Sequence, residues 1–270
     1  MFNPLSTKDS AIQIALKLEG EDLWNFCIIN KQLLKWICNN KQFWNQKIRR
    51  DFDINAYETL NRSGVSEDYG FLYIIIRDKD LSMLGELLVK ESRAENIDHV
   101  KLLLKKGADI HAQNDRALTQ AARNGHKDAV ELLLENGANI HAQDDEALRG
   151  AAMNGHRDVT ELLLKYGADV HAGFPDTDEA LRLAAQNGHR DVVELLLKNG
   201  ADIHAKSDSA LGWAAEEGHR DVVELLLNNG ADIHALNDYA LRYAAQGGYK
   251  DVVELLLKNG ANIHEGMIWL

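Results

Sequence analysis

The sequence has few of the residues that build disulfide-bonded or membrane-embedded proteins. Of its 270 residues, two are cysteine and two are proline. Two cysteines cannot form a disulfide framework, so we expect Cys27 and Cys38 to be reduced residues of an apolar helical region in a reducing compartment. No apolar run approaches the roughly 18 residues that a membrane-spanning helix needs. The first residues show no basic segment followed by an apolar one, so we expect no secretory signal and an intracellular, cytoplasmic protein.

Sequence signatures of catalysis are missing as well. The chain contains no HExxH, CxxC, GxxxxGK[ST] or GxSxG pattern. Cys27 has no histidine before residue 99 that could activate it. We therefore predict a protein that is not an enzyme and has no catalytic residues, no cofactor and no metal site.

Positive charge is also scarce. The chain has 30 basic and 42 acidic residues, a formal net charge of −12. A phosphate backbone requires a basic face, so this balance disfavours nucleic acid as a partner. Residues 1–60 carry 8 basic and 7 acidic groups, whereas residues 61–270 carry 22 and 35. The change indicates two modules, and we expect a monomer that binds neither nucleic acid nor membranes.

What the sequence does contain is a repeated unit of about 30 residues. Its clearest copy is GHRDVVELLLKNGADIHA, at residues 188–205. Related copies occupy residues 125–142, 155–172, 218–235 and 248–265, and a diverged copy occupies 95–112. The histidines near the ends of these copies are spaced by 30, 30, 33, 30 and 30 residues: His111, His141, His171, His204, His234 and His264. Units of this kind stack on their neighbours and bury a continuous core.

Each unit predicts two helices. The pattern Ala-Leu-x-x-Ala-Ala marks the first helix, a glycine ends it, and DVVELLL marks the second. An aspartate stands just before most first helices, where we expect its carboxylate to cap free N–H groups: Asp115, Asp145, Asp208 and Asp238.

These motifs resemble the ankyrin repeat, which has L-x-x-A-A, then G-H, VVELLL and GAD-I. The resemblance implies an all-α solenoid of about six helix-turn-helix repeats, here preceded by a small helical bundle. Histidine stands where the family usually has asparagine, and most hairpin fingers are short. Only residues 172–178 restore the full finger length. We divide the chain into 1–55, a connector and helix at 56–79, repeats at 80–111 (irregular), 112–141, 142–171, 172–204, 205–234 and 235–264, and a tail at 265–270.

The first 55 residues resemble a degenerate F-box. Asp9, the pair Asp22 and Leu23, and aliphatic residues at intermediate spacing match the F-box pattern, which closes on a tryptophan. Ser6 and Thr7 replace the usual Leu-Pro. The resemblance implies docking on a Skp-type adaptor of a cullin–RING ubiquitin ligase, through Ile14, Leu18, Leu23 and Trp44. The alternative is a helical cap for the stack. Short GADIHA repeats behind such a module resemble the ankyrin proteins of giant DNA viruses of the mimivirus type, which implies the host cytoplasm.

Ten of the eleven histidines occupy two repeat positions. Equivalent residues of stacked helices lie about 8–10 Å apart, whereas zinc gathers its ligands at about 2.0–2.1 Å. We therefore interpret these histidines as structural, with hydrogen bonds to loop backbone.

Residues that vary between repeats are the candidates for partner binding. In ankyrin proteins the first helix and the finger line the concave face. Arg149, Arg182 and Arg242 fall at one repeat position and suggest an acidic or aromatic patch on the target, although each could instead pair with an acid of a neighbouring repeat. Trp213 shares a position with Leu183 and Tyr243, where packing between repeats is the alternative role. The predicted target-binding residues are Arg116, Arg123, Arg149, Met153, Phe174, Pro175, Arg182, Gln186, Trp213, Glu216, Tyr239, Arg242 and Gln246.

The sequence therefore predicts a non-catalytic protein-interaction module. The leading hypothesis is a substrate-recognition adaptor that joins a target on the ankyrin surface to a ubiquitin ligase through residues 1–55. The alternative is a scaffold or sequestering inhibitor without a ligase link.

Overall fold

The computed structural model describes residues 81–173 and 178–263. The F-box-like module, the connector with its predicted helix and the C-terminal tail lie outside these residues. Within the described ranges every regular element is a helix, which confirms the predicted all-α class. None of these helices is long and apolar enough to cross a membrane.

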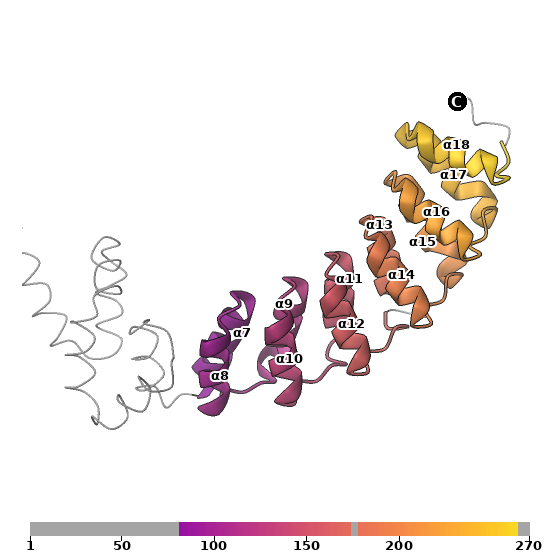
Figure 1. Ribbon diagram of the computed structural model, residues 1–270. Coiled ribbons are helices and arrows are strands. Elements are labelled where there is room, and N and C mark those ends of the chain that lie inside the picture. Colours follow the sequence, from indigo (N-terminus) through magenta and orange to yellow (C-terminus); the bar gives the residue numbers. More distant parts are fainter. Residues whose placement is uncertain (1–80, 174–177, 264–270) are drawn as a thin grey trace, which may run out of the picture. The chain divides into compact units, whose positions relative to one another are not determined.

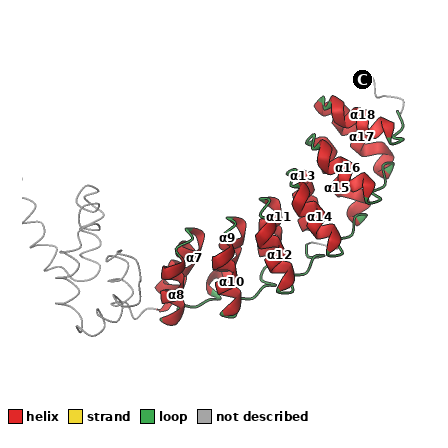
Figure 2. Ribbon diagram, in the orientation of Figure 1, coloured by secondary structure: helices red, strands yellow, loops and turns green. Residues whose placement is uncertain are grey.

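The described helices form six consecutive pairs, shown in Figure 1 and coloured by secondary structure in Figure 2. In each pair a short loop joins a first helix to a second. The pairs are α7 (Leu81–Arg93) and α8 (Ile97–Lys105), α9 (Ala112–Arg123) and α10 (Lys127–Glu135), α11 (Glu146–Met153) and α12 (Arg157–Lys165), α13 (Glu179–Gln186) and α14 (Arg190–Lys198), α15 (Ala205–Glu216) and α16 (Arg220–Asn228), and α17 (Ala235–Gly247) and α18 (Lys250–Lys258).

The chain divides into two compact units. One comprises residues 1–84 and 98–108, in which Val100 and Leu103 of α8 are fully buried. The other comprises residues 85–97 and 109–270. In this second unit the first helices α9, α11, α13, α15 and α17 pack on one another in chain order, and the second helices α10, α12, α14, α16 and α18 do the same. The unit is therefore a two-layered stack in which each pair contacts its neighbours.

The core of the stack is the repeated leucine and alanine pattern. One leucine of each first helix is buried, at positions Leu118, Leu148, Leu181, Leu211 and Leu241. The second helices contribute Leu133, Leu163, Leu196, Leu226 and Leu256, all fully buried. Burying one such side chain stabilises the fold by about 1.5–3 kcal/mol. The paired alanines have almost no side chain to separate the first helices, so these helices approach closely.

The glycine that ends each first helix has two roles. At Gly155 the backbone has φ +74°, which glycine adopts without strain. A Cβ added there would also lie 2.6 Å from Nδ1 of His189, in the next repeat. The glycine thus ends its helix and leaves room for the histidine ring of the following repeat.

Short repeats replace the longer finger with a left-handed turn. Three consecutive residues have positive φ at 113–115, 143–145, 206–208 and 236–238. The predicted N-cap role of the aspartate that closes this turn is wrong. Asp145 precedes its helix with φ 53° and makes no side-chain capping hydrogen bond, and Asp178 with φ 41° behaves in the same way. A residue in this left-handed conformation points its carboxylate elsewhere, toward the partners described below.

Candidate functional site

Buried aspartates connect the two ends of each repeat. The side chains of Asp115, Asp145, Asp178, Asp208 and Asp238 are 2–6% exposed. Each accepts a hydrogen bond from the backbone N–H group 24 residues later, as in Asp115 to Asn139 (2.7 Å) and Asp208 to Asp232 (2.7 Å). The aspartate therefore anchors the loop that follows the second helix of its own repeat instead of capping its helix.

The repeat-ending histidines complete this network. Nδ1 of His141 lies 3.2 Å from both carboxylate oxygens of Asp145, and Nδ1 of His204 lies 3.1 Å from Asp208. The hydrogen bond that the His171 ring donates to Asp178 raises the pKa of the His171 imidazole; burial opposes this, and the charges of Asp178, Asp169 and Asp202 add to it. These histidines are structural, as expected, but they bond to a carboxylate and not to loop backbone.

The second histidine set bonds to backbone, as predicted. Nε2 of His126 lies 3.0 Å from the carbonyl oxygen of Arg93, and Nε2 of His156 lies 3.0 Å from that of Arg123. His189 and His219 make the same bond at 2.9 Å, to Met153 and Gln186. Both sets are thus occupied in holding repeats together. In the described part of the chain no three potential ligands gather around one point that could hold a metal ion.

Two arginines of the predicted row form ion pairs with one glutamate, Glu179. Nη1 of Arg149 lies 2.5 Å from Oε2 of Glu179 in the next repeat, and Nη2 of Arg182 lies 3.2 Å from Oε1 of the same carboxylate. Burial raises the pKa of Glu179, but the hydrogen bonds and charges of Arg149 and Arg182 outweigh it and lower that pKa. Two guanidinium groups therefore share one carboxylate, so this cluster keeps an excess positive charge.

Aromatic side chains continue the row toward the C-terminal repeats. The guanidinium of Arg182 lies 6.0 Å from the Trp213 ring centre, and that of Arg242 lies 6.0 Å from the Tyr239 ring centre, at the limit for a cation–π contact. Tyr239 stacks on Tyr243 with ring centres 4.0 Å apart.

The hydroxyl of Tyr239 is also engaged. It donates a hydrogen bond of 2.8 Å to Glu216, and burial, this bond and the Glu216 charge all raise the tyrosine pKa. Trp213, Tyr239 and Tyr243 are half-buried, so each is held in place by neighbours and still presents surface to solvent.

The remaining predicted target residues differ in their exposure and in their partners. Met153 is 41% exposed, and Arg116, Arg242 and Gln246 are also exposed. Arg123 lies 3.6 Å from Glu146, and Gln186 accepts a hydrogen bond from Arg182. Phe174 and Pro175, together with the predicted adaptor residues Ile14, Leu18, Leu23 and Trp44, lie outside the described residues.

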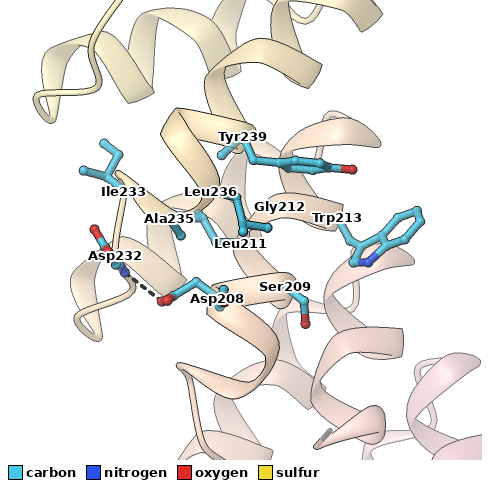
Figure 3. A pocket seen from close by; sticks show the side chains of 12 residues that line it. Asp208, Ser209, Leu211, Gly212, Trp213, Asp232, Ile233, Ala235, Leu236 and Tyr239 are labelled. Carbon is cyan, nitrogen blue, oxygen red and sulfur yellow. Dashed lines mark hydrogen bonds between the residues drawn. The ribbon is translucent and has the colours of Figure 1, made fainter.

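Sequence reasoning missed two residues at a hollow between α15 and α17. The hollow has a volume of about 160 Å³ and contains Gly212 and Leu236 in its lining (Figure 3). Gly212 occupies the position that holds Arg149, Arg182 and Arg242 in other repeats. The sequence therefore contained a signal for this hollow, because the glycine interrupts the arginine row.

Comparisons with known proteins agree with this architecture. A sequence model described as ankyrin repeats (3 copies) matches residues 86–144, 144–207 and 181–266. The crystal structure of the human ASB11 ankyrin repeat domain is similar to this chain, with a TM-score of 0.61 and 26% sequence identity over 66% of this chain and 85% of that one. A search of curated proteins finds no match. Because the repeat models cover more than half of its residues, this chain belongs to the ankyrin-repeat family.

Proposed function

We propose that the protein recognises a target protein on its first-helix surface, meaning the exposed side chains of α9, α11, α13, α15 and α17. Ankyrin repeats are protein-interaction modules, and the fold is typically non-catalytic. The observation that carries the proposal is the line of arginine and aromatic side chains across α13, α15 and α17. These residue types dominate the energetics of protein interfaces, and here they vary between repeats whose framework stays constant.

The charges on this surface favour an acidic target. Arg149 and Arg182 share the single carboxylate of Glu179. In the described part of the chain, Arg242 forms no ion pair; its Nη2 donates to the carbonyl oxygen of Leu236 (3.3 Å). A locally positive strip on a protein of net charge −12 would steer an acidic segment toward these helices.

We further propose that residues 1–55 link this target to a ubiquitin ligase. The support is the F-box-like sequence pattern alone. In this arrangement the protein supplies no catalytic group and acts in the cytoplasm, in a host cell if its origin is viral. It would raise the effective concentration of the target at the ligase.

Co-purification tests the two halves separately. The full chain should retain a Skp-type adaptor, and the full-length variants Leu23→Asp and Trp44→Ala should lose it while their repeats melt unchanged. Retention of the adaptor by both variants would show that the docking residues are wrongly assigned. Failure of the unaltered chain to bind the adaptor would leave the scaffold or sequestering function, with the target-binding surface unaffected.

A further inference from the structure

The hollow between α15 and α17 arises from two departures from the repeat. Gly212 replaces the arginine that stands at the equivalent position of three other repeats. Leu236 is 57% exposed at a position where the other short repeats have Gln113, Gln143 and Lys206. Leu236 also has φ 52°, a left-handed conformation that is strained for a residue with a Cβ. An exposed leucine in a strained turn has no packing role that explains it.

The hollow has the size and chemistry for one apolar side chain. Its lining includes Leu211, Ala235, Leu236 and Tyr239, which are labelled in Figure 3, and a Cβ added at Gly212 would lie 3.0 Å from the Tyr239 ring. The volume of about 160 Å³ is comparable to that of an apolar cavity that binds benzene, about 150 Å³. A phenyl ring or a branched aliphatic side chain therefore fits.

The polar groups nearest the hollow are already engaged. Asp208 accepts hydrogen bonds from His204 and from the N–H of Asp232. The Asp232 carboxylate in turn accepts from the N–H of His234. These carboxylates hold the two turns together, and the rest of the lining is mainly apolar, with the hydroxyl groups of Ser207 and Ser209 as its other polar side chains.

Positive charge flanks the hollow on the two neighbouring first helices. Arg182 and Arg242 stand at the position of Gly212, one repeat before and one repeat after it. Adjacent packed helices lie about 8–10 Å apart. An extended chain advances about 3.3 Å per residue, so it would pass from one helix to the next in about three residues.

We propose that this hollow anchors an extended, acidic segment of the target. One large aliphatic or aromatic side chain enters the hollow against Leu236 and Gly212. Carboxylates about three residues before and after it contact Arg182 and Arg242. The inference rests on the proposed target-binding function and specifies which partner chemistry that surface selects.

A random library of short displayed peptides, selected against the full chain, tests this inference. Enriched peptides should share one large apolar residue with Asp or Glu about three residues to either side. The double variant Gly212→Arg with Tyr239→Glu places at this site the residue pair that Arg149 and Glu179 form elsewhere, so we expect it to fold, with a melting temperature lowered by the lost contacts of Tyr239 with Tyr243 and Glu216. It fills the hollow and should weaken the selected peptides at least about tenfold.

Leu236→Gln provides a second, smaller change, because glutamine occupies the same turn position in two other repeats. It should weaken binding without loss of stability, whereas Gln143→Ala at the equivalent turn serves as the matched control and should leave binding unchanged. Peptides that bind both hollow variants as tightly as the unaltered chain would overturn the inference. So would a selection that enriches no acidic, apolar motif. Neither result bears on co-purification of a folded target, which tests the proposed function by itself.

Discussion

The carboxylate of Asp145 connects two repeats through different groups. It lies 3.2 Å from Nδ1 of His141, the last residue of the preceding repeat, and it accepts a 2.9 Å hydrogen bond from the backbone N–H of Asp169 near the end of its own repeat. The same arrangement recurs at each described repeat boundary from Asp115 onward. A buried carboxylate in a left-handed conformation makes these bonds in the short repeats and also at Asp178, which follows the full-length finger.

Asp145→Ala should lower the free energy of unfolding by about 2–3 kcal/mol. The change leaves a buried N–H without its acceptor, and hydrogen bonds to charged groups contribute about 1.5–3 kcal/mol. Urea unfolding of the full chain measures this loss. Asp144→Asn, at the exposed neighbouring position, is the control and should change stability little; equal losses at both sites would contradict the role of Asp145.

The stability of the 172–204 repeat should fall as pH rises above about 6.5. The pKa of His171 is raised above its ordinary value of 6.5 in the folded protein, with the hydrogen bond that its ring donates to Asp178 as the main cause. Stabilisation by the charged imidazole is thus fully present below about 6.5 and is lost as pH rises through the folded pKa. Titration of the His171 ring by NMR gives that pKa directly, and His171→Gln should flatten this part of the pH profile. A titration at or below 6.5 would disprove the prediction.

Gly155→Ala should destabilise the stack more than Gly137→Ala. Both residues have positive φ, +74° and +95°, so both changes carry a backbone penalty of about 1–2 kcal/mol. A Cβ at Gly155 also meets the His189 ring at 2.6 Å, whereas one at Gly137 meets nothing within 4 Å. Thermal melts of the two variants separate the steric effect from the backbone effect. Adding His189→Ala to Gly155→Ala should cost less than the sum of the two single changes.

Arg149→Ala should reduce stability by about 1 kcal/mol as well as affecting target binding. Its guanidinium bonds to Glu179 and to the carbonyl oxygen of Gln143, so part of its role is to join two repeats. Because the pKa of Glu179 is lowered in the folded protein, this contribution is present above the carboxyl's unfolded pKa and is lost as pH falls through the folded one. Urea unfolding near neutral and at acidic pH checks both statements. A loss that is independent of pH would contradict the ion-pair explanation.

The fold could be predicted from the periodicity of the sequence, because each helix and its end depend on residues that are close together in the chain. Leu181, Leu196 and the leucines at the equivalent positions of the other repeats are buried, since a helix with that apolar pattern must be covered on its inner side. Gly188 was predicted to end a helix and has φ +76°. The structural role of the histidines was likewise expected, because identical residues spaced one repeat apart cannot converge on one ion.

Other features could not be predicted from the pattern. Asp145 looks like an N-cap from its place before a helix, yet the left-handed turn aims its carboxylate at a residue 24 positions away. Whether Arg149 and Arg182 were free or paired depended on Glu179 lying between them, which requires the register between adjacent repeats. Predicting the hollow at Gly212 also requires the register between adjacent repeats, because Leu236 and Tyr239 line it from the next repeat.

The sequence by itself determined the repeat, its two helices, its glycine ends and its buried leucines, since these follow from short-range periodicity and backbone preference. Only the tertiary structure decided which polar groups meet. Partners such as Asp208 and Asp232, or Gly212 and Tyr239, lie more than 20 residues apart. The first contact depends on how the two helices of one repeat pack on each other, and the second depends on how one repeat is seated against the next, which packing of the whole interface between repeats sets.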